Sequence, residues 1–217
     1  MKKLIFGLLI FLIIINVKAE DSLATNAKSA ILIEASTGNI IYEKNSHEKL
    51  HPASMTKMMS MLLIVEAIEN KAITWDEMVT VSENASSMGG SQILLETNEK
   101  MKVADLFKGI AIASGNDAVV AMAEKIAGTE EAFVNMMNSK AKELKMVDTN
   151  FKNPHGLDAT NHYSSAYDMA LLAKELVKHK KVLEYTSIYE DYLRKNTDKQ
   201  IWLVNTNKVV YIFSNKK

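Results

Sequence analysis

The sequence predicts an α+β domain in which a hairpin is followed by several helices and then by further strands. Strand-like runs flank a turn near the start of the chain, and apolar residues recur at helical spacing through its middle. Short strand-like runs return near its end. Strands and helices that occur in separate runs are typical of α+β proteins rather than of βαβ units.

The first two predicted elements are a hairpin and an apolar helix. Residues 30–34 and 40–43 are strand-like, and the sequence Ser-Thr-Gly-Asn at 36–39 is a turn between them. Apolar residues then recur at helical spacing from about Ser54 to Glu69. This helix is apolar almost all round, which indicates that it lies inside the core.

Three further helices are predicted in the middle of the chain. The spacing of apolar residues predicts helices over 103–112, 118–127 and about 130–145. Gly128 is placed to end the second of these, and Thr129 is placed to cap the third. Residues 73–81 form a short stretch with a mixed pattern, which predicts the start of a helix and a strand.

The last third begins with a long loop over 151–165. Ser165, with an aspartate three residues later, predicts the start of a helix that runs to about Lys178. After Lys181 the pattern is weaker, and residues 201–204 and 209–213 are predicted to be strands.

Composition excludes several classes of function. The chain has 217 residues, enough for one domain with a sizeable core, and its formal net charge is zero, so it carries no nucleic-acid-binding footprint. The absence of cysteine excludes thiol catalysis and thiolate metal sites. The five histidines show no tight ligand spacing, so we expect no metal site and no cofactor.

The N-terminal residues form a signal-peptide pattern. Lys2 and Lys3 precede an apolar stretch over 4–17, and Ala19 follows it. We therefore expect residues 1–19 to be a signal peptide that is cleaved after Ala19, with export to the periplasm or the cell-wall space. An uncleaved N-terminal anchor is the alternative, although the stretch is short for a membrane span.

One Ser-x-x-Lys pair stands out among the four in the chain. These pairs begin at Ser46, Ser54, Ser139 and Ser214, and only Ser54 opens an apolar helix. Ser54 and Lys57 are therefore candidates for a nucleophile and its base. Two structural interpretations compete with these roles. In one, Ser54 is only an N-cap, and in the other Lys57 extends to solvent along its stem.

A second candidate cluster lies between two apolar helices. Ser114 and Asn116 flank Gly115 in a short break, where both side chains could point into one cleft. The alternative is an ordinary turn between helices, in which serine, glycine and asparagine are all common.

Taken in order, these motifs resemble those of the penicillin-binding serine peptidases, in particular the low-molecular-mass D-alanyl-D-alanine carboxypeptidases. HPASMTKMM is similar to their nucleophile segment, and the resemblance extends over about residues 27–207. It implies a β-lactamase/transpeptidase-like fold, with helices packed on an antiparallel sheet, for a catalytic domain over 26–217.

The resemblance also implies roles for individual residues. Ser54 would be the nucleophile, Lys57 its base, and Ser114 a proton relay to the leaving group. Asn116 would hold Lys57 and the substrate amide. The substrate would be a peptidoglycan pentapeptide ending in D-Ala-D-Ala, cleaved through an acyl-enzyme on Ser54 that β-lactams would trap.

The sequence departs from the family in one important respect. It contains no Lys-Thr-Gly or Lys-Ser-Gly, the third family motif, which lies on a sheet strand. We therefore expect a domain that lacks its C-terminal strands and the family's membrane anchor, with weak or no activity, since the missing strand supplies an oxyanion-hole donor.

Two other functions compete with a truncated carboxypeptidase. A non-catalytic remnant would still bind peptidoglycan or β-lactams. A class A β-lactamase-like hydrolase is disfavoured because Gly115 replaces the aspartate of Ser-Asp-Asn and NPHGLDATNHY contains no glutamate.

Overall fold

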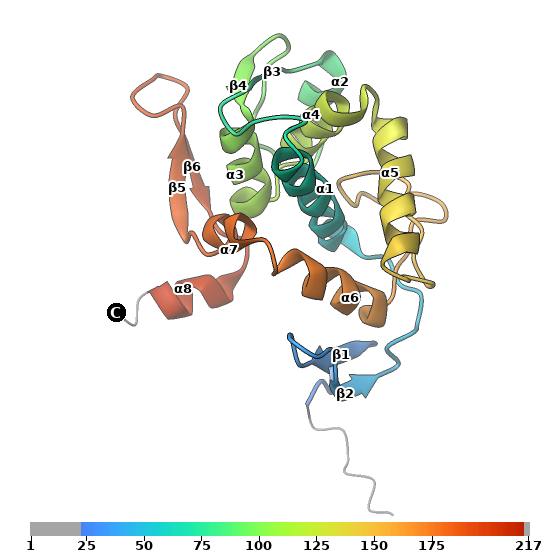
Figure 1. Cartoon of the computed structure of the whole chain (residues 1–217). Coiled ribbons are helices and arrows are strands. Elements are labelled where there is room, and N and C mark those ends of the chain that lie inside the picture. Colours follow the sequence, from blue (N-terminus) through green and yellow to red (C-terminus); the bar gives the residue numbers. More distant parts are fainter. Residues whose placement is uncertain (1–22, 215–217) are drawn as a thin grey trace, which may run out of the picture.

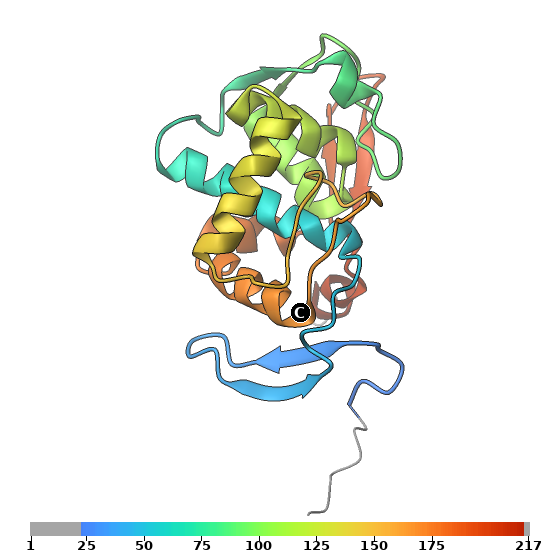
Figure 2. The ribbon, with the colours of Figure 1, turned by 90° about the vertical axis from the view of Figure 1, so that its right-hand side faces the viewer.

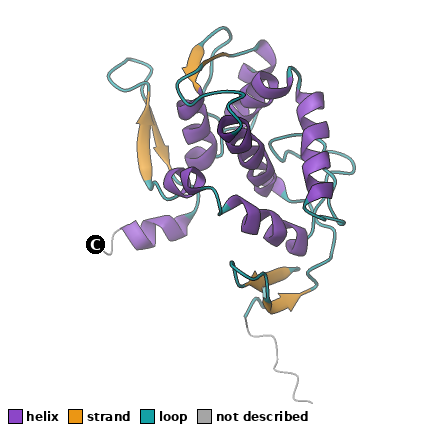
Figure 3. Ribbon diagram, in the orientation of Figure 1, coloured by secondary structure: helices purple, strands orange, loops and turns teal. Residues whose placement is uncertain are grey.

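The computed structural model describes residues 23–214, so the predicted signal peptide lies outside the described residues. Helices build most of the molecule, and short strands lie at its edges (Figure 3). The predicted α+β class is confirmed. The strands are β1 (Ala30–Ile33), β2 (Ile40–Lys44), β3 (Met78–Thr80), β4 (Lys100–Lys102), β5 (Glu190–Leu193) and β6 (Ile201–Val204).

The helices enclose a single apolar core. They are the 3₁₀ turn η1 (Ala53–Thr56) and helices α1 (Lys57–Glu69), α2 (Glu83–Ser86), α3 (Val103–Ala113), α4 (Asn116–Ala127), α5 (Glu130–Glu143), α6 (Ala166–Leu176), α7 (Lys180–Thr186) and α8 (Lys208–Ser214). Helix α1 runs through the centre and contacts α3, α4, α5 and α6 (Figure 1). Its position explains why it is apolar almost all round.

The strands pair as three separate antiparallel ladders within residues 23–214. These ladders are β1 with β2, β3 with β4, and β5 with β6. The β1–β2 hairpin lies beneath α6 (Figure 2), and β1 contacts α6. Its outer residues are open to solvent, with Ile41 63% exposed.

The helix caps follow the sequence pattern. Thr129 Oγ1 accepts the Ala132 N–H at 3.1 Å at the start of α5, and Ser165 Oγ accepts the Asp168 N–H at 3.1 Å at the start of α6. Gly128 ends α4 with φ +81°. Each cap satisfies backbone groups that a helix end leaves unpaired.

The predicted strand over 209–213 is wrong, because these residues form helix α8. Asn207 starts the helix, since its Oδ1 accepts the Val209 N–H at 3.0 Å and its carbonyl accepts the Val210 N–H at 3.1 Å. A short apolar run does not distinguish strand from helix by periodicity alone, and the capping asparagine decides between them here.

Candidate functional site

Ser54 lies in the 3₁₀ turn η1, immediately before α1. No side chain caps α1, whose N-cap position is occupied by Thr56. The interpretation of Ser54 as the helix cap is therefore wrong. Its side chain is exposed, and its hydroxyl is within reach of the Lys57 amine at 3.5 Å, the long end of hydrogen-bond distance.

Lys57 does not extend to solvent, because it is only 3% exposed. Its Nζ donates to the carbonyl oxygen of His155 at 2.8 Å and reaches Ser54 Oγ at 3.5 Å. Burial lowers the pKa of the Lys57 amine to about 8, and the negative charge of Asp117 opposes part of that effect. An amine with this pKa is partly neutral near physiological pH, and only the neutral amine can accept a proton.

Ser114 ends α3 in the left-handed conformation, with φ 58° and ψ 36°. This conformation is uncommon for serine but is a frequent way for a helix to end. Its Oγ is buried and finds no hydrogen-bond partner among residues 23–214. A hydroxyl left unpaired in this way is available to a substrate or to a transferred proton.

Ser54, Lys57 and Ser114 line one cavity of about 390 Å³. Its other walls come from η1, α1, α3, the α6–α7 region and the segment before α8, namely Met55, Met58, Met61, Ile110, Ala111, Leu176, Val177, Val182, Leu183, Thr186, Asn205, Thr206 and Asn207. The structure therefore brings three of the four candidate residues together from two segments about sixty residues apart.

Asn116 lies outside the lining of this cavity. It is 3% exposed, and its Nδ2 donates to the carbonyl oxygen of Gly89 at 2.7 Å. Its backbone N–H donates to the carbonyl oxygen of Ser91 at 2.7 Å. In this structure Asn116 therefore holds the 89–91 loop, while the Lys57 amine donates to His155 O and Ser54 Oγ and not to the Asn116 amide expected from the family resemblance.

Asp117 is a site residue that the sequence analysis missed. It is 1% exposed, and its carboxylate accepts the backbone N–H groups of Ile93, Leu95 and Ala118 at distances between 2.8 and 3.1 Å. The charge acts on the Lys57 amine, as described above. The signal available in the sequence was an aspartate directly after Ser-Gly-Asn at a helix start, where it is also an ordinary first-turn residue.

The loop that receives Lys57 packs tightly against η1. Gly156 has φ +92°, and a Cβ at this position would lie 1.9 Å from the carbonyl oxygen of Ala53. Asn153 closes the turn, since its Oδ1 accepts the Gly156 N–H at 2.7 Å and its Nδ2 donates to Leu157 O at 2.8 Å. Only glycine combines this backbone angle with so close an approach.

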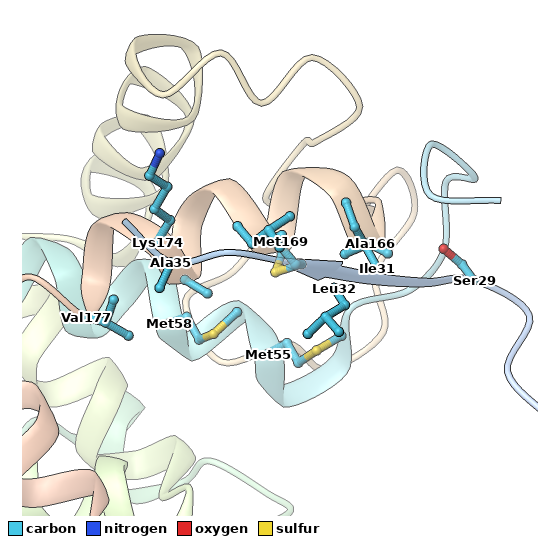
Figure 4. Close-up of a pocket in the computed structure, with 13 residues that line it drawn as sticks. Ser29, Ile31, Leu32, Ala35, Met55, Met58, Ala166, Met169, Lys174 and Val177 are labelled. Carbon is cyan, nitrogen blue, oxygen red and sulfur yellow. The ribbon is translucent and has the colours of Figure 1, made fainter. Parts of the chain in front are cut away.

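A larger cavity of about 490 Å³ adjoins this site, between β1, α6 and the start of α1 (Figure 4). Met55, Met58 and Val177 line both cavities, and Figure 4 shows Met169 and Lys174 on the α6 side of the larger one. Its lining is mostly apolar and includes neither Lys57 nor Ser114. The reactive groups thus gather in the smaller cavity.

Two classes of feature are absent from residues 23–214. No group of three or more histidine or acidic side chains is placed to hold a metal ion. None of the helices there has the length and apolar character needed to cross a membrane.

Comparison with known proteins identifies a family. The model of the D-alanyl-D-alanine carboxypeptidase family of peptidases matches residues 16–216. D-alanyl-D-alanine carboxypeptidase DacF of Bacillus subtilis is 59% identical over 196 residues, which cover 90% of this chain and 50% of DacF. The chain spans about half the length of the curated relatives it matches.

Solved structures give the same fold. Penicillin-binding protein 5 of Haemophilus influenzae aligns with a TM-score of 0.81 and 33% identity, over 87% of this chain and 54% of that one. Penicillin-binding protein D2 of Listeria monocytogenes, in its ampicillin-bound form, aligns with a TM-score of 0.73 and 29% identity, over 85% and 74%. The expected transpeptidase-like fold is thereby confirmed.

Proposed function

Because this chain belongs to the D-alanyl-D-alanine carboxypeptidase family of peptidases, we propose that it carries the nucleophile, base and proton relay of a serine carboxypeptidase. The proposed substrate is a peptidoglycan stem peptide that ends in D-Ala-D-Ala. The reaction would remove the terminal D-alanine during synthesis or remodelling of the cell wall.

The proposed chemistry has two steps. Neutral Lys57 takes the proton of Ser54 Oγ, which attacks the carbonyl carbon of the terminal peptide bond. The carbon–nitrogen bond breaks, the D-alanine amine leaves with a proton passed through Ser114, and an ester to Ser54 remains. Water then hydrolyses this ester, so that one water is consumed for each D-alanine released.

One observation carries this proposal. The Lys57 amine is buried, has a pKa lowered to about 8 and lies 3.5 Å from the exposed hydroxyl of Ser54. Desolvation of a lysine beside a serine is the arrangement that activates a hydroxyl nucleophile without histidine. The unpaired Ser114 hydroxyl in the same cavity supports the assignment of the proton relay.

Asn116 is proposed to act from behind the cavity. Its bonds to Gly89 and Ser91 fix the neighbouring loop, and its backbone follows directly after Ser114 and Gly115. We propose that substrate contact by its amide requires release of the Gly89 carbonyl.

β-Lactams are proposed to acylate the same serine. The relative from Listeria is known in ampicillin-bound and cefotaxime-bound forms. A strained lactam presents a carbonyl to Ser54 in the same way as the terminal peptide bond does, and its opening leaves the same kind of ester.

The 217 residues contain no Lys-Thr-Gly or Lys-Ser-Gly, the motif that the family resemblance links to one oxyanion-hole donor. Loss of one oxyanion-hole donor costs about 10²–10³ in rate. We therefore expect these residues alone to acylate slowly.

Covalent labelling tests the proposed function. The protein is incubated with a fluorescent penicillin, beside the Ser54→Ala variant and the Ser139→Ala control, and the adduct is located by peptide mass spectrometry. We expect slow labelling that Ser54→Ala abolishes and Ser139→Ala leaves unchanged. Labelling that survives Ser54→Ala, or no adduct after prolonged incubation, would refute acylation at Ser54.

Export is proposed from the signal-peptide pattern of residues 1–19. It would bring the protein to the proposed substrate, the stem peptides outside the cytoplasm. N-terminal sequencing of the protein from the producing cell checks this. A start near Glu20 is expected, and intact Met1 in a cytoplasmic fraction would contradict it.

A further inference from the structure

Two successive carbonyl groups of the 153–157 loop face α1. Pro154 O accepts the Ser60 hydroxyl at 2.7 Å, and His155 O accepts the Lys57 amine at 2.8 Å. The second bond is shorter than the 3.5 Å between Lys57 Nζ and Ser54 Oγ. The position of the amine therefore depends on where this loop places its carbonyl.

The His155 ring connects the loop to a different helix. Its Nδ1 accepts the Leu157 N–H at 3.1 Å, so in the neutral ring the proton is on Nε2. Nε2 lies 3.6 Å from Glu130 Oε1, and the ring is almost fully buried. The ring thus bridges the loop and the first turn of α5.

Glu130 lies at the capped start of α5, where it meets this ring. Thr129 caps α5, and Glu130 is the first residue of the helix, where the dipole favours a negative charge. The nearby His155 ring, with Nε2 3.6 Å from Oε1, lowers the pKa of the Glu130 carboxyl, although burial opposes this. Glu131, its neighbour, has the same charge but is exposed, and so offers a matched control.

We propose that Glu130 is a positioning residue for the Lys57 amine, which it reaches through the His155 ring and the His155 carbonyl. This inference rests on the proposed role of Lys57 as the base. A carbonyl acceptor favours the charged form of a lysine. When Glu130 no longer contacts the His155 ring, the His155 carbonyl moves away from Lys57 Nζ. The pKa of Lys57 then falls further.

Three variants separate the contact between the Glu130 carboxylate and the His155 ring, called the tether below, from the negative charge of Glu130. Glu130→Ala removes both, Glu130→Asp keeps the charge but withdraws the carboxylate by one methylene, and Glu130→Gln keeps an acceptor without the charge. Glu131→Ala removes one acidic side chain from the same helix turn. Asp117, whose charge also acts on Lys57, is unchanged in all four variants.

The primary measurement is the titration of Lys57 itself, by NMR of protein carrying ¹³C- and ¹⁵N-labelled lysine, with Lys57→Arg for assignment. We expect Glu130→Ala and Glu130→Asp to lower the pKa of Lys57 by about half a unit or more, because its acceptor is displaced. Glu130→Gln should shift it less than Glu130→Ala, and Glu131→Ala should leave it unchanged. A merely structural role for Glu130 would lower the melting temperature without moving this pKa.

The titration does not require catalysis, so it stays informative if the proposed function fails. Absence of penicillin labelling in every form, with the Lys57 shift present, would overturn the proposed function but support the positioning. Equal titrations in Glu130→Ala and Glu131→Ala would overturn the positioning. If Glu130→Ala does not fold, Glu130→Asp decides, since an unshifted Lys57 in that variant contradicts the tether.

Discussion

Two Ser-x-x-Lys pairs with the same spacing, Ser54–Lys57 and Ser139–Lys142, have very different surroundings. Ser139 and Lys142 lie on the exposed face of α5, and Ser139 Oγ donates to the Asn135 carbonyl one turn earlier at 2.8 Å. Lys57 is instead buried, with its amine held by His155 O. The motif therefore supplies only proximity, while the fold supplies desolvation and an acceptor.

The difference comes from segments that are distant in the sequence. The Ser54–Lys57 pair is closed in by the end of α3, which presents Ser114, and by the 153–157 loop, which presents a carbonyl. The Ser139–Lys142 pair faces solvent. A base needs a site that removes water from the amine, and a helix surface cannot do so.

Replacing the lysine in each pair with arginine should give the largest difference in acylation rate between the two pairs. Lys57→Arg keeps a cation but cannot deprotonate, so acylation should fall by about 10²–10⁴-fold, the range for loss of a general base. Lys142→Arg should leave the rate unchanged. The measurement is the rate of fluorescent penicillin labelling, and a Lys57→Arg protein that labels at the unsubstituted rate would exclude Lys57 as the base.

Two glycines allow a matched test of the loop that holds Lys57. Gly156→Ala should lower the free energy of unfolding by about 3 kcal/mol or more, because the new Cβ meets the Ala53 carbonyl and the backbone must move. Gly128 also has a positive φ, but a Cβ there meets nothing within 4 Å. Gly128→Ala should therefore cost only about 1–2 kcal/mol.

Denaturant unfolding of both variants is the measurement. Equal costs at the two positions would mean that the loop adjusts freely against η1. That result would contradict a fixed His155 carbonyl.

The pH dependence of acylation tests whether the buried Lys57 amine titrates differently from an ordinary lysine. The pKa of Lys57 is lowered to about 8 from 10.5, so the neutral amine forms as the pH rises through 8. The labelling rate should increase about tenfold per pH unit below 8 and level off above it. At pH 7 about a tenth of the molecules carry the neutral amine.

Rates measured between pH 5.5 and 9.5 check this, with the stability of the penicillin and the fold followed in parallel. A rate that is flat across pH 8 would show that Lys57 does not titrate in the step measured. A rate that is still rising about tenfold per pH unit at pH 9.5 would show that the amine is not desolvated.

Much of this fold could be predicted from side-chain patterns, because periodicity and capping are local. The hairpin, the central helices and the caps at Thr129 and Ser165 are all confirmed. The pairing of Ser54 with Lys57 follows from helical spacing, whereas the closeness of Ser114 came from family resemblance.

What the sequence could not give involves backbone atoms and long-range packing. The acceptor for Lys57 is a carbonyl, which every residue has, so no letter marks His155 for this role. The Asn116 amide is satisfied by Gly89 O, also a backbone atom. The error at 209–213 is of a different kind, because the cap at Asn207 is a local signal, and the prediction weighed only the apolar content of the run.

The smallest effect compares two serines at helix starts and decides between function and capping for Ser54. Ser165 Oγ accepts the Asp168 N–H, so Ser165→Ala should lower the free energy of unfolding by about 1 kcal/mol. Ser54 caps no helix and is exposed, so Ser54→Ala should change stability by less than about 0.5 kcal/mol. The measurement is urea unfolding of the two variants beside the unsubstituted protein. A loss for Ser54→Ala equal to that for Ser165→Ala would revive the capping interpretation. If the Ser54→Ala protein instead loses its labelling and keeps its full stability, the Ser54 hydroxyl serves the reaction and not the fold, because an alanine then stabilises the fold equally well.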